Sequence, residues 1–155
     1  MLEYGGHVKE LYGGELNTTN NRMELTALIE ALAALTKKNY DVRVFSDSSY
    51  LIECMRKRWH EKWAINGWQT TGKKPVGNRE LWERLFEFLP DYEFSYYLVK
   101  GHIGQRARED TKRKGYERFV RNNGDAFSFE EFLLIAEKNN RADELANLGI
   151  EEART

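Results

Sequence analysis

The sequence predicts an α/β fold, in which short strands alternate with helices. A β-rich run at 42–46 ends in Asp47 and hydroxyl residues and passes directly into a helical segment from Tyr50. A second β-rich run occupies 94–100. Apolar residues on a 3.6-residue period predict a helix over about 18–38. A strand that leads directly into a helix is typical of α/β proteins.

Length and composition predict one globular domain. The chain has 155 residues, of which 41% are hydrophobic and 32% are charged, and no apolar run approaches the length of a membrane span. We therefore expect no membrane partner. The single Cys54 excludes an internal disulfide, and the N-terminus lacks the residue order of a signal peptide. A cytoplasmic location is expected.

The first 12 residues predict a β-hairpin. Leu2–Tyr4 and Val8–Tyr12 are the expected strands, and Gly5-Gly6 is the expected turn. Glycine suits this turn because it tolerates positive φ.

Glu24 is the first candidate functional residue. In the first predicted helix it falls on the same face as Leu28, Ala31 and Leu35, so it is expected to face inward. A carboxylate facing a core costs several kcal/mol unless a cation, a metal or a hydrogen-bond network receives it. The alternative is a capping box, in which Asn21 is the N-cap and Glu24 reaches back to its N–H. This segment alone leaves both interpretations open.

Two further candidates follow the predicted strands. Asp47 ends the run at 42–46, and His102 follows the run at 94–100. In open α/β sheets, ligands gather at the carboxyl ends of strands, so both side chains are expected near a site. The alternatives are an ordinary helix N-cap at Asp47 or Ser48 and a solvated loop histidine.

Positive charge is concentrated between residues 54 and 79. This stretch holds seven Lys and Arg residues against Glu61 alone, a local charge of +6 in a chain whose net charge is -1. Trp59, Trp63 and Trp68 lie among these cations. Cations alternating with aromatic side chains suit phosphate contacts and stacking on bases, so we favour a nucleic-acid contact over a solvated face with packed tryptophans.

The last third of the chain predicts a basic run at 112–114, a turn at 122–125 and then two helices. Ser128 and Glu131 are spaced as a capping box for the first helix. The second helix is expected over 139–146, with Gly149 as its stop signal.

Four motifs occur in the order found in a known enzyme family. They are Thr18-Thr19-Asn20-Asn21-Arg22-Met23-Glu24-Leu25, Ser46-Asp47-Ser48, Val99-Lys100-Gly101-His102 and Arg141-Ala142-Asp143-Glu144-Leu145-Ala146. Together with the basic segment they resemble type 1 ribonuclease H of the bacterial kind. The resemblance covers 2–104 and 139–148, and it implies a ribonuclease H-like fold over 1–155, with a mixed sheet flanked by helices. Residues 105–138 are then an inserted basic and helical segment. In a chain with its first strand restored, deletion of this segment is expected to leave the sheet in place.

The resemblance also implies an activity. Members of this family are endonucleases that use two divalent ions, Mg²⁺ or Mn²⁺, to cut the RNA strand of RNA·DNA hybrids. Motif by motif, Glu24, Asp47 and Asp143 match metal-binding acids. His102 matches a mobile histidine that assists proton transfer or product release. The positions that match contacts to the hybrid are Asn20, Asn21, Ser49, Trp59, Trp63, Lys73 and Lys74.

One part of the family pattern has no counterpart in this sequence. The family begins with a central strand that carries its first metal-binding Asp, whereas Met1 resembles the interior of the second strand. We therefore expect the upstream reading frame to encode a further strand ending in Asp-Gly, and translating that DNA tests the expectation. A monomer is expected for the full fold, and a strand-swapped oligomer for this chain is the alternative. The alternative function is a non-catalytic hybrid-binding or truncated ribonuclease H-like domain.

Overall fold

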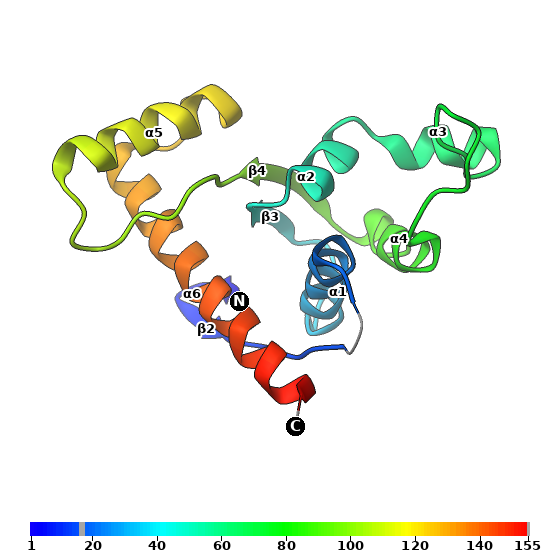
Figure 1. Cartoon of the computed structure of the whole chain (residues 1–155), viewed down its shortest axis with the longest axis horizontal. Helices are drawn as coiled ribbons and strands as arrows, with labels where there is room; N and C mark the ends of the chain where they lie inside the picture. The colour runs from blue at the N-terminus through cyan, green and yellow to red at the C-terminus, as the bar shows by residue number, and fades with distance from the viewer. Residues whose placement is uncertain (16–17, 155) are drawn as a thin grey trace. The chain divides into compact units, whose positions relative to one another are not determined.

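The structure is a computed structural model that describes residues 1–15 and 18–154 (Figure 1). Its elements in chain order are β1 (Leu2–Tyr4), β2 (His7–Lys9), α1 (Asn20–Ala33), β3 (Asp41–Ser46), α2 (Ser49–Arg56), α3 (Trp59–Asn66), α4 (Arg79–Phe86), the 3-10 helix η1 (Leu89–Asp91), β4 (Glu93–Leu98), α5 (Glu109–Asn123) and α6 (Phe129–Arg154). The predicted α/β class is confirmed. In the described part of the chain, no helix is long and apolar enough to cross a membrane.

The chain divides into two compact units. Among the described residues, unit 1 comprises 1–15, 45–47 and 97–154, and unit 2 comprises 18–44 and 48–96. Each unit has its own cluster of buried hydrophobic side chains. The single domain expected over the whole chain stays a prediction.

Strands β1 and β2 of unit 1 form an antiparallel hairpin. Gly5 and Gly6 make the turn with φ of +54° and +82°, a conformation that glycine adopts without steric cost. The predicted hairpin is confirmed, although its second strand ends at Lys9 and not at Tyr12. Glu10 instead forms an ion pair with α6.

Strands β3 and β4 pair with each other. The Glu93 N–H donates to the Tyr40 carbonyl at 3.1 Å, and the Val99 N–H donates to the Ser46 carbonyl at 2.9 Å. Because the two bonds join residues of equal sequence separation, the strands run parallel. The residues that follow both strands therefore leave the sheet at the same edge.

Unit 2 packs around an aromatic and aliphatic core. Trp82, Leu85 and Ile29 are fully buried. Trp63 contacts both Trp82 and Trp68, with ring centroids 5.4 and 5.5 Å apart. Helix α1 packs against α4 in this unit (Figure 1).

Helix α1 has different ends from the predicted helix. Its N-cap is Thr19, whose Oγ1 accepts the Arg22 N–H at 3.2 Å, so the capping box built on Asn21 is wrong. The helix ends at Ala33 and does not continue to Lys38. Leu35 still packs against the core of unit 2, but the polar residues 36–38 beyond it offer no apolar face to bury, which removes the main stabilisation of a further turn.

The buried face of α1 is also shifted by one residue. Leu25, Ile29 and Leu32 are the buried positions, and Glu24 lies half-buried on their flank. The prediction that Glu24 tops the inward stripe is therefore wrong. The helix turns its most apolar stripe inward, and that stripe starts one residue later.

Unit 1 packs around phenylalanine side chains. Phe119 of α5, Phe132 of α6 and Phe127 between these helices are buried together with Val99 and Ala136. Helix α5 lies beside the first half of α6 (Figure 1). Four of these five buried side chains belong to 105–138, so this segment builds much of the core of unit 1.

The local structure of this segment contains one helix more than predicted. The basic residues 112–114 lie inside α5, which ends at Asn123 within the predicted turn at 122–125. The capping box is confirmed, because the Ser128 N–H donates to Glu131 Oε1 at 3.0 Å and the Glu131 N–H donates to Ser128 Oγ at 3.1 Å.

Helix α6 is continuous through the boundary expected between the two last helices. The separate helix predicted over 139–146 is therefore wrong, and Gly149 does not stop α6. A Cβ atom on Gly149 would lie 2.1 Å from the Gly13 carbonyl oxygen. The glycine thus permits close approach of another backbone, a role that its position in the sequence alone does not reveal.

Candidate active site

Asp47 lies directly after β3 in unit 1. Lys100 Nζ donates to the Asp47 carbonyl oxygen at 2.5 Å, which ties the backbone at Asp47 to the segment after β4. The Asp47 side chain is half-buried. The N-cap of α2 is Ser48, whose Oγ accepts the Leu51 N–H at 3.1 Å, so Asp47 is not the helix cap.

Asn140 connects the segment that carries His102 to α6. Its Nδ2 donates to the Ile103 carbonyl oxygen at 2.7 Å. Asp143 is three residues further along α6 and therefore lies on the same face as Asn140. This hydrogen bond ties the segment of exposed His102 to the helix that carries exposed Asp143.

Three of the predicted residues in unit 1, Asp47, His102 and Asp143, are linked by electrostatic interactions. The pKa of the Asp143 carboxyl is raised, first because neighbouring atoms remove part of its hydration and second because the Asp47 carboxylate is near. His102 acts in the opposite direction and lowers this pKa. Asp47, His102 and Asp143 therefore interact, and the two carboxylates repel each other in the absence of a cation.

Asn123 holds the end of β4 from α5, and the sequence pattern gave no sign of this role. Its Oδ1 accepts the Leu98 N–H at 2.7 Å. Its Nδ2 donates to the carbonyl oxygens of Leu98 and Phe119 at 2.8 and 2.9 Å. An Asn-Gly pair at 123–124 is typical of a turn, so only the tertiary structure reveals the bridge.

The other predicted site residues belong to unit 2. Asn20 and Asn21 are exposed in the first turn of α1, the helix that also carries half-buried Glu24. Ser49 is the first residue of α2 and is half-buried.

The two predicted tryptophan contacts differ in exposure. Trp59 is half-buried at the start of α3, with Lys57 Nζ 6.0 Å from its ring centroid. Trp63 is only 6% exposed and packs in the core of unit 2. In this structure the ring of Trp63 offers no face for stacking on a base.

Lys73 and Lys74 are presented together on an exposed loop. The Thr70 N–H donates to the Lys74 carbonyl at 2.8 Å, and the Lys73 N–H donates to the Thr70 carbonyl at 2.9 Å. These bonds close a tight turn that leaves both lysine side chains in solvent.

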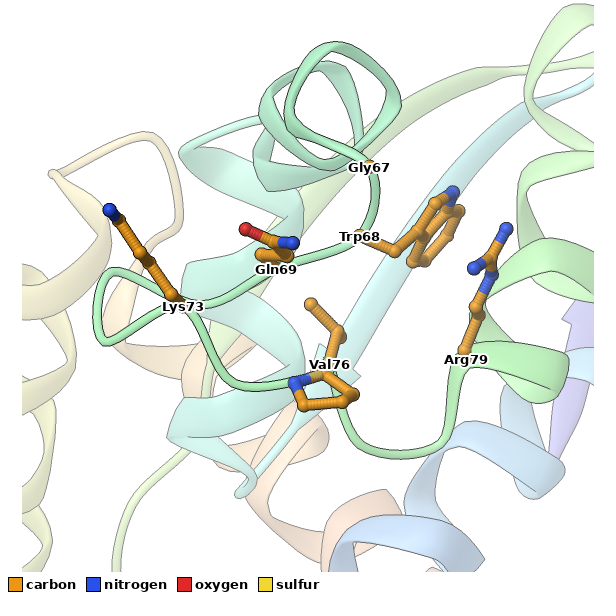
Figure 2. Close-up of a pocket in the computed structure, with 7 residues that line it drawn as sticks. Gly67, Trp68, Gln69, Lys73, Val76 and Arg79 are labelled. Atoms are coloured by element: carbon orange, nitrogen blue, oxygen red, sulfur yellow. The ribbon is translucent and has the colours of Figure 1, made fainter.

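A shallow pocket of about 220 Å³ lies at the base of this loop. Figure 2 shows the Trp68 ring facing Arg79, and the Arg79 guanidinium lies 5.0 Å from the ring centroid. Lys73 borders the same pocket, with its ammonium directed away from Trp68 (Figure 2). The pocket thus combines a ring face with cations.

The chemistry of unit 1 defines a class of protein. Among residues 1–15 and 18–154, neither unit contains three His, Cys, Asp or Glu side chains that lie close enough together to hold a metal ion by themselves. Mg²⁺ commonly binds one or two carboxylates together with water and substrate phosphates, which two nearby aspartates suit. Two carboxylates and an imidazole that interact in this way suit metal-assisted hydrolysis of a phosphodiester.

Comparisons with known proteins agree with this class. A family model described as RNase H matches residues 1–115. Ribonuclease H of Maricaulis maris is 40% identical over 154 residues, which cover 99% of this chain and 82% of the relative. Ribonuclease H of Ralstonia nicotianae is 40% identical over 99% of this chain and 80% of its own length. Ribonuclease H of Syntrophomonas wolfei is 45% identical over 70% of this chain and 75% of its own length.

The chain belongs to the ribonuclease H family, whose members are enzymes that hydrolyse RNA in RNA·DNA hybrids. The family generally depends on divalent metal ions. The matched residues 1–115 include Glu24, Asp47 and His102. The aligned span of the Maricaulis and Ralstonia relatives extends over almost the whole of this chain.

Proposed function

We propose that this chain cleaves the RNA strand of RNA·DNA hybrids at a site built on Asp47, Asp143 and His102, with Glu24 as a third acid. The observation that carries the proposal is that Asp47 and His102 both act on the pKa of the Asp143 carboxyl within unit 1. Family membership supports the reaction. Glu24 supports it through its half-buried carboxylate on α1.

The donor set of unit 1 fits a divalent metal. Carboxylate oxygens are the hard ligands that Mg²⁺ and Mn²⁺ prefer, and a cation relieves the repulsion between Asp47 and Asp143. Asp47, Asp143 and Glu24 are the residues that would hold the two ions. Bound there, two ions would activate water and stabilise the leaving 3′-oxygen.

The remaining roles follow from the positions of the side chains. Exposed His102 lies on the segment fixed by Asn140 and can carry a proton to the leaving oxygen or assist product release. Lys100 donates to the Asp47 carbonyl and so holds the backbone from which that carboxylate projects.

Unit 2 supplies the proposed contacts to the hybrid. Lys73 and Lys74 project from an exposed loop and suit phosphate groups. Asn20 and Asn21, at the start of α1, and Ser49, at the start of α2, can contact the RNA 2′-hydroxyl, which distinguishes RNA from DNA. Half-buried Trp59 retains a partly exposed ring for stacking.

Three further properties stay predictions. They are a cytoplasmic location, a monomeric state of the full family fold, and a single domain into which 105–138 is inserted. Gel filtration with light scattering would distinguish the monomer from the strand-swapped oligomer.

The test is cleavage of an RNA·DNA hybrid labelled at the RNA 5′ end, with and without Mg²⁺. Replacing Asp47 with Asn should lower the cleavage rate by at least about a thousandfold, since metal sites supply several kcal/mol to such reactions. Hybrid affinity should stay within about tenfold, because Asp47 is assigned to metal and not to nucleic acid.

The matched control is Asp125→Asn, which removes one exposed carboxylate of unit 1. This control should cleave at the unmodified rate. Retained turnover in Asp47→Asn would contradict the metal assignment. Hybrid binding by the unmodified chain without any Mg²⁺-dependent cleavage would favour the non-catalytic hybrid-binding domain.

A further inference from the structure

Helix α5 carries a stripe of exposed positive charge. Lys114, Arg118 and Arg121 are spaced by four and three residues, so their side chains lie on one face of the helix. All three residues are exposed, whereas Phe119 points from the other side of α5 into the core of unit 1. We define these three residues as the α5 stripe.

The cations of the α5 stripe are available for a ligand. Within the described ranges 1–15 and 18–154, none of the three forms an ion pair. The neighbouring cations Arg113 and Lys112 of α5 are less accessible to a ligand. Arg113 pairs with Glu109 at 3.5 Å and lies 3.8 Å from the centroid of the Phe129 ring, and Lys112 is half-buried beside a groove.

The α5 stripe lies beside the segment that carries His102. A Cβ atom built on Gly101 would lie 3.7 Å from Arg118 Nη1, so this guanidinium is in contact range of the backbone next to His102. Asn123 fixes the end of α5 to Leu98, the last residue of β4. The stripe is therefore held at the same edge of unit 1 as the proposed active site.

The charge of this region suits a polyanion. Residues 106–121 contain seven Lys and Arg residues against three Asp and Glu residues, so unlike the chain as a whole the region carries net positive charge. Guanidinium groups bind phosphate oxygens with two parallel hydrogen bonds, and cations four residues apart on a helix can follow successive phosphates.

We propose that the α5 stripe binds the phosphate backbone of the RNA·DNA hybrid next to the cleavage site. This inference rests on the proposed function, and it assigns a nucleic-acid contact to the segment 105–138. Arg118 is the central contact, because it lies nearest to the segment that carries His102. Lys114 and Arg121 extend the contact by one helical turn on either side.

The experiment measures hybrid affinity as a function of salt concentration, with EDTA present to prevent cleavage. The slope of log K against log[salt] is negative. The variant Arg118→Gln/Arg121→Gln should reduce its magnitude by about two, because each lost phosphate contact removes about 0.9. The matched control Lys112→Gln/Arg113→Gln removes the same charge from the same helix. Its slope should equal that of the unmodified protein.

A second variant separates charge from structure. Arg118→Lys keeps a cation near Gly101 and should retain the original slope, whereas Arg118→Gln should lower it by about one. Thermal melting of each variant confirms that unit 1 is folded. Equal slopes for the stripe variant and the Lys112/Arg113 control would overturn the inference.

Failure of the inference is distinguishable from failure of the proposed function. If the unmodified protein binds the hybrid and Lys73→Ala/Lys74→Ala lowers the slope while the stripe variant does not, only the inference is overturned. If the unmodified protein does not bind the hybrid, both are overturned. Vesicles containing phosphatidylserine test another polyanion, and loss of vesicle binding with an unchanged hybrid slope would also overturn the inference.

Discussion

The two compact units differ in how their cores relate to the matched family. All buried residues of the unit 2 cluster lie within residues 1–115, where the family model matches. The unit 1 cluster takes Phe119, Phe127, Phe132 and Ala136 from beyond that range. The family pattern is therefore sufficient to build one core, whereas the other core depends on a segment that the pattern does not describe.

The units also differ in the roles proposed for their side chains. In unit 1, Asp47 raises and His102 lowers the pKa of the Asp143 carboxyl. Unit 2 presents Lys73 and Lys74 on a loop above an aromatic core. Side-chain hydrogen bonds to the backbone hold the segments that carry the acids, whereas backbone hydrogen bonds within the turn hold the lysine loop. The next three predictions address this contrast, from the largest expected effect to the smallest.

Deleting 105–138 and closing the gap with a short Gly-Ser linker should unfold unit 1. The sequence resemblance suggested that the sheet would tolerate this deletion, and the buried phenylalanines reverse that expectation. Each buried Phe contributes about 3–5 kcal/mol to the free energy of unfolding. The loss of Phe119, Phe127 and Phe132 together is therefore comparable to the whole stability of a typical domain. Near-UV circular dichroism and calorimetry should show loss of the cooperative transition of unit 1.

A matched pair of point variants checks the same claim without a deletion. Phe119→Ala should destabilise by about 3–5 kcal/mol, whereas Leu134→Ala, at a position 55% exposed on α6, should change stability by less than about 0.5 kcal/mol. A native-like melt of the deletion variant would show that unit 1 does not need this core.

The thiol of Cys54 should be almost inert while unit 2 is folded. Burial raises its pKa to about 12, so at pH 8 the thiolate fraction falls on the order of a thousandfold below that of a free cysteine. Because Cys54 is the only cysteine in the sequence, the labelling rate with a thiol reagent reports on unit 2 alone. Labelling in concentrated urea is the control, and fast labelling of the native protein at pH 8 would contradict the buried position.

Asn123→Ala should destabilise unit 1 by about 2 kcal/mol. The substitution leaves the N–H and carbonyl of Leu98 without their side-chain partner, and each unsatisfied group costs about 1–3 kcal/mol unless water replaces the bond. Asn147→Ala, on the exposed surface of α6, is the matched control and should be neutral. Equal urea midpoints for the two variants would show that the polar bridge contributes nothing.

Local sequence patterns predicted the elements that depend on local chemistry. Gly5-Gly6 required positive φ, and Ser128 with Glu131 required a capping box, so both features were readable without tertiary information. The two strands were predictable because β-rich runs end abruptly at Asp47 and before His102. These positions also indicated the unit 1 site.

Features set by tertiary contacts were not predictable in the same way. Gly149 was predicted to end a helix, but its lack of a side chain instead allows the backbone of Gly13 to pack closely against α6. The predicted buried face of α1 was one residue away from the observed one, which begins at Leu25 and not at Glu24. The spacing of apolar residues does not fix how a helix is rotated against its neighbours. Asn123 and Arg118 gave no signal, since their roles depend on segments more than a dozen residues away.

The continuity of α6 has a mechanical consequence. Phe132 and Asp143 are eleven residues apart on one uninterrupted helix, a distance of about 16 Å at 1.5 Å per residue. The first turns of α6 are anchored in the phenylalanine core through Phe132, so any tilt of the helix there moves Asp143 as well. A tilt of about 10° at Phe132 displaces Asp143 by about 3 Å, which exceeds the tolerance of about 0.5 Å expected for a catalytic constellation. Substitutions in the core of unit 1 thus change the alignment of an acid that they never touch.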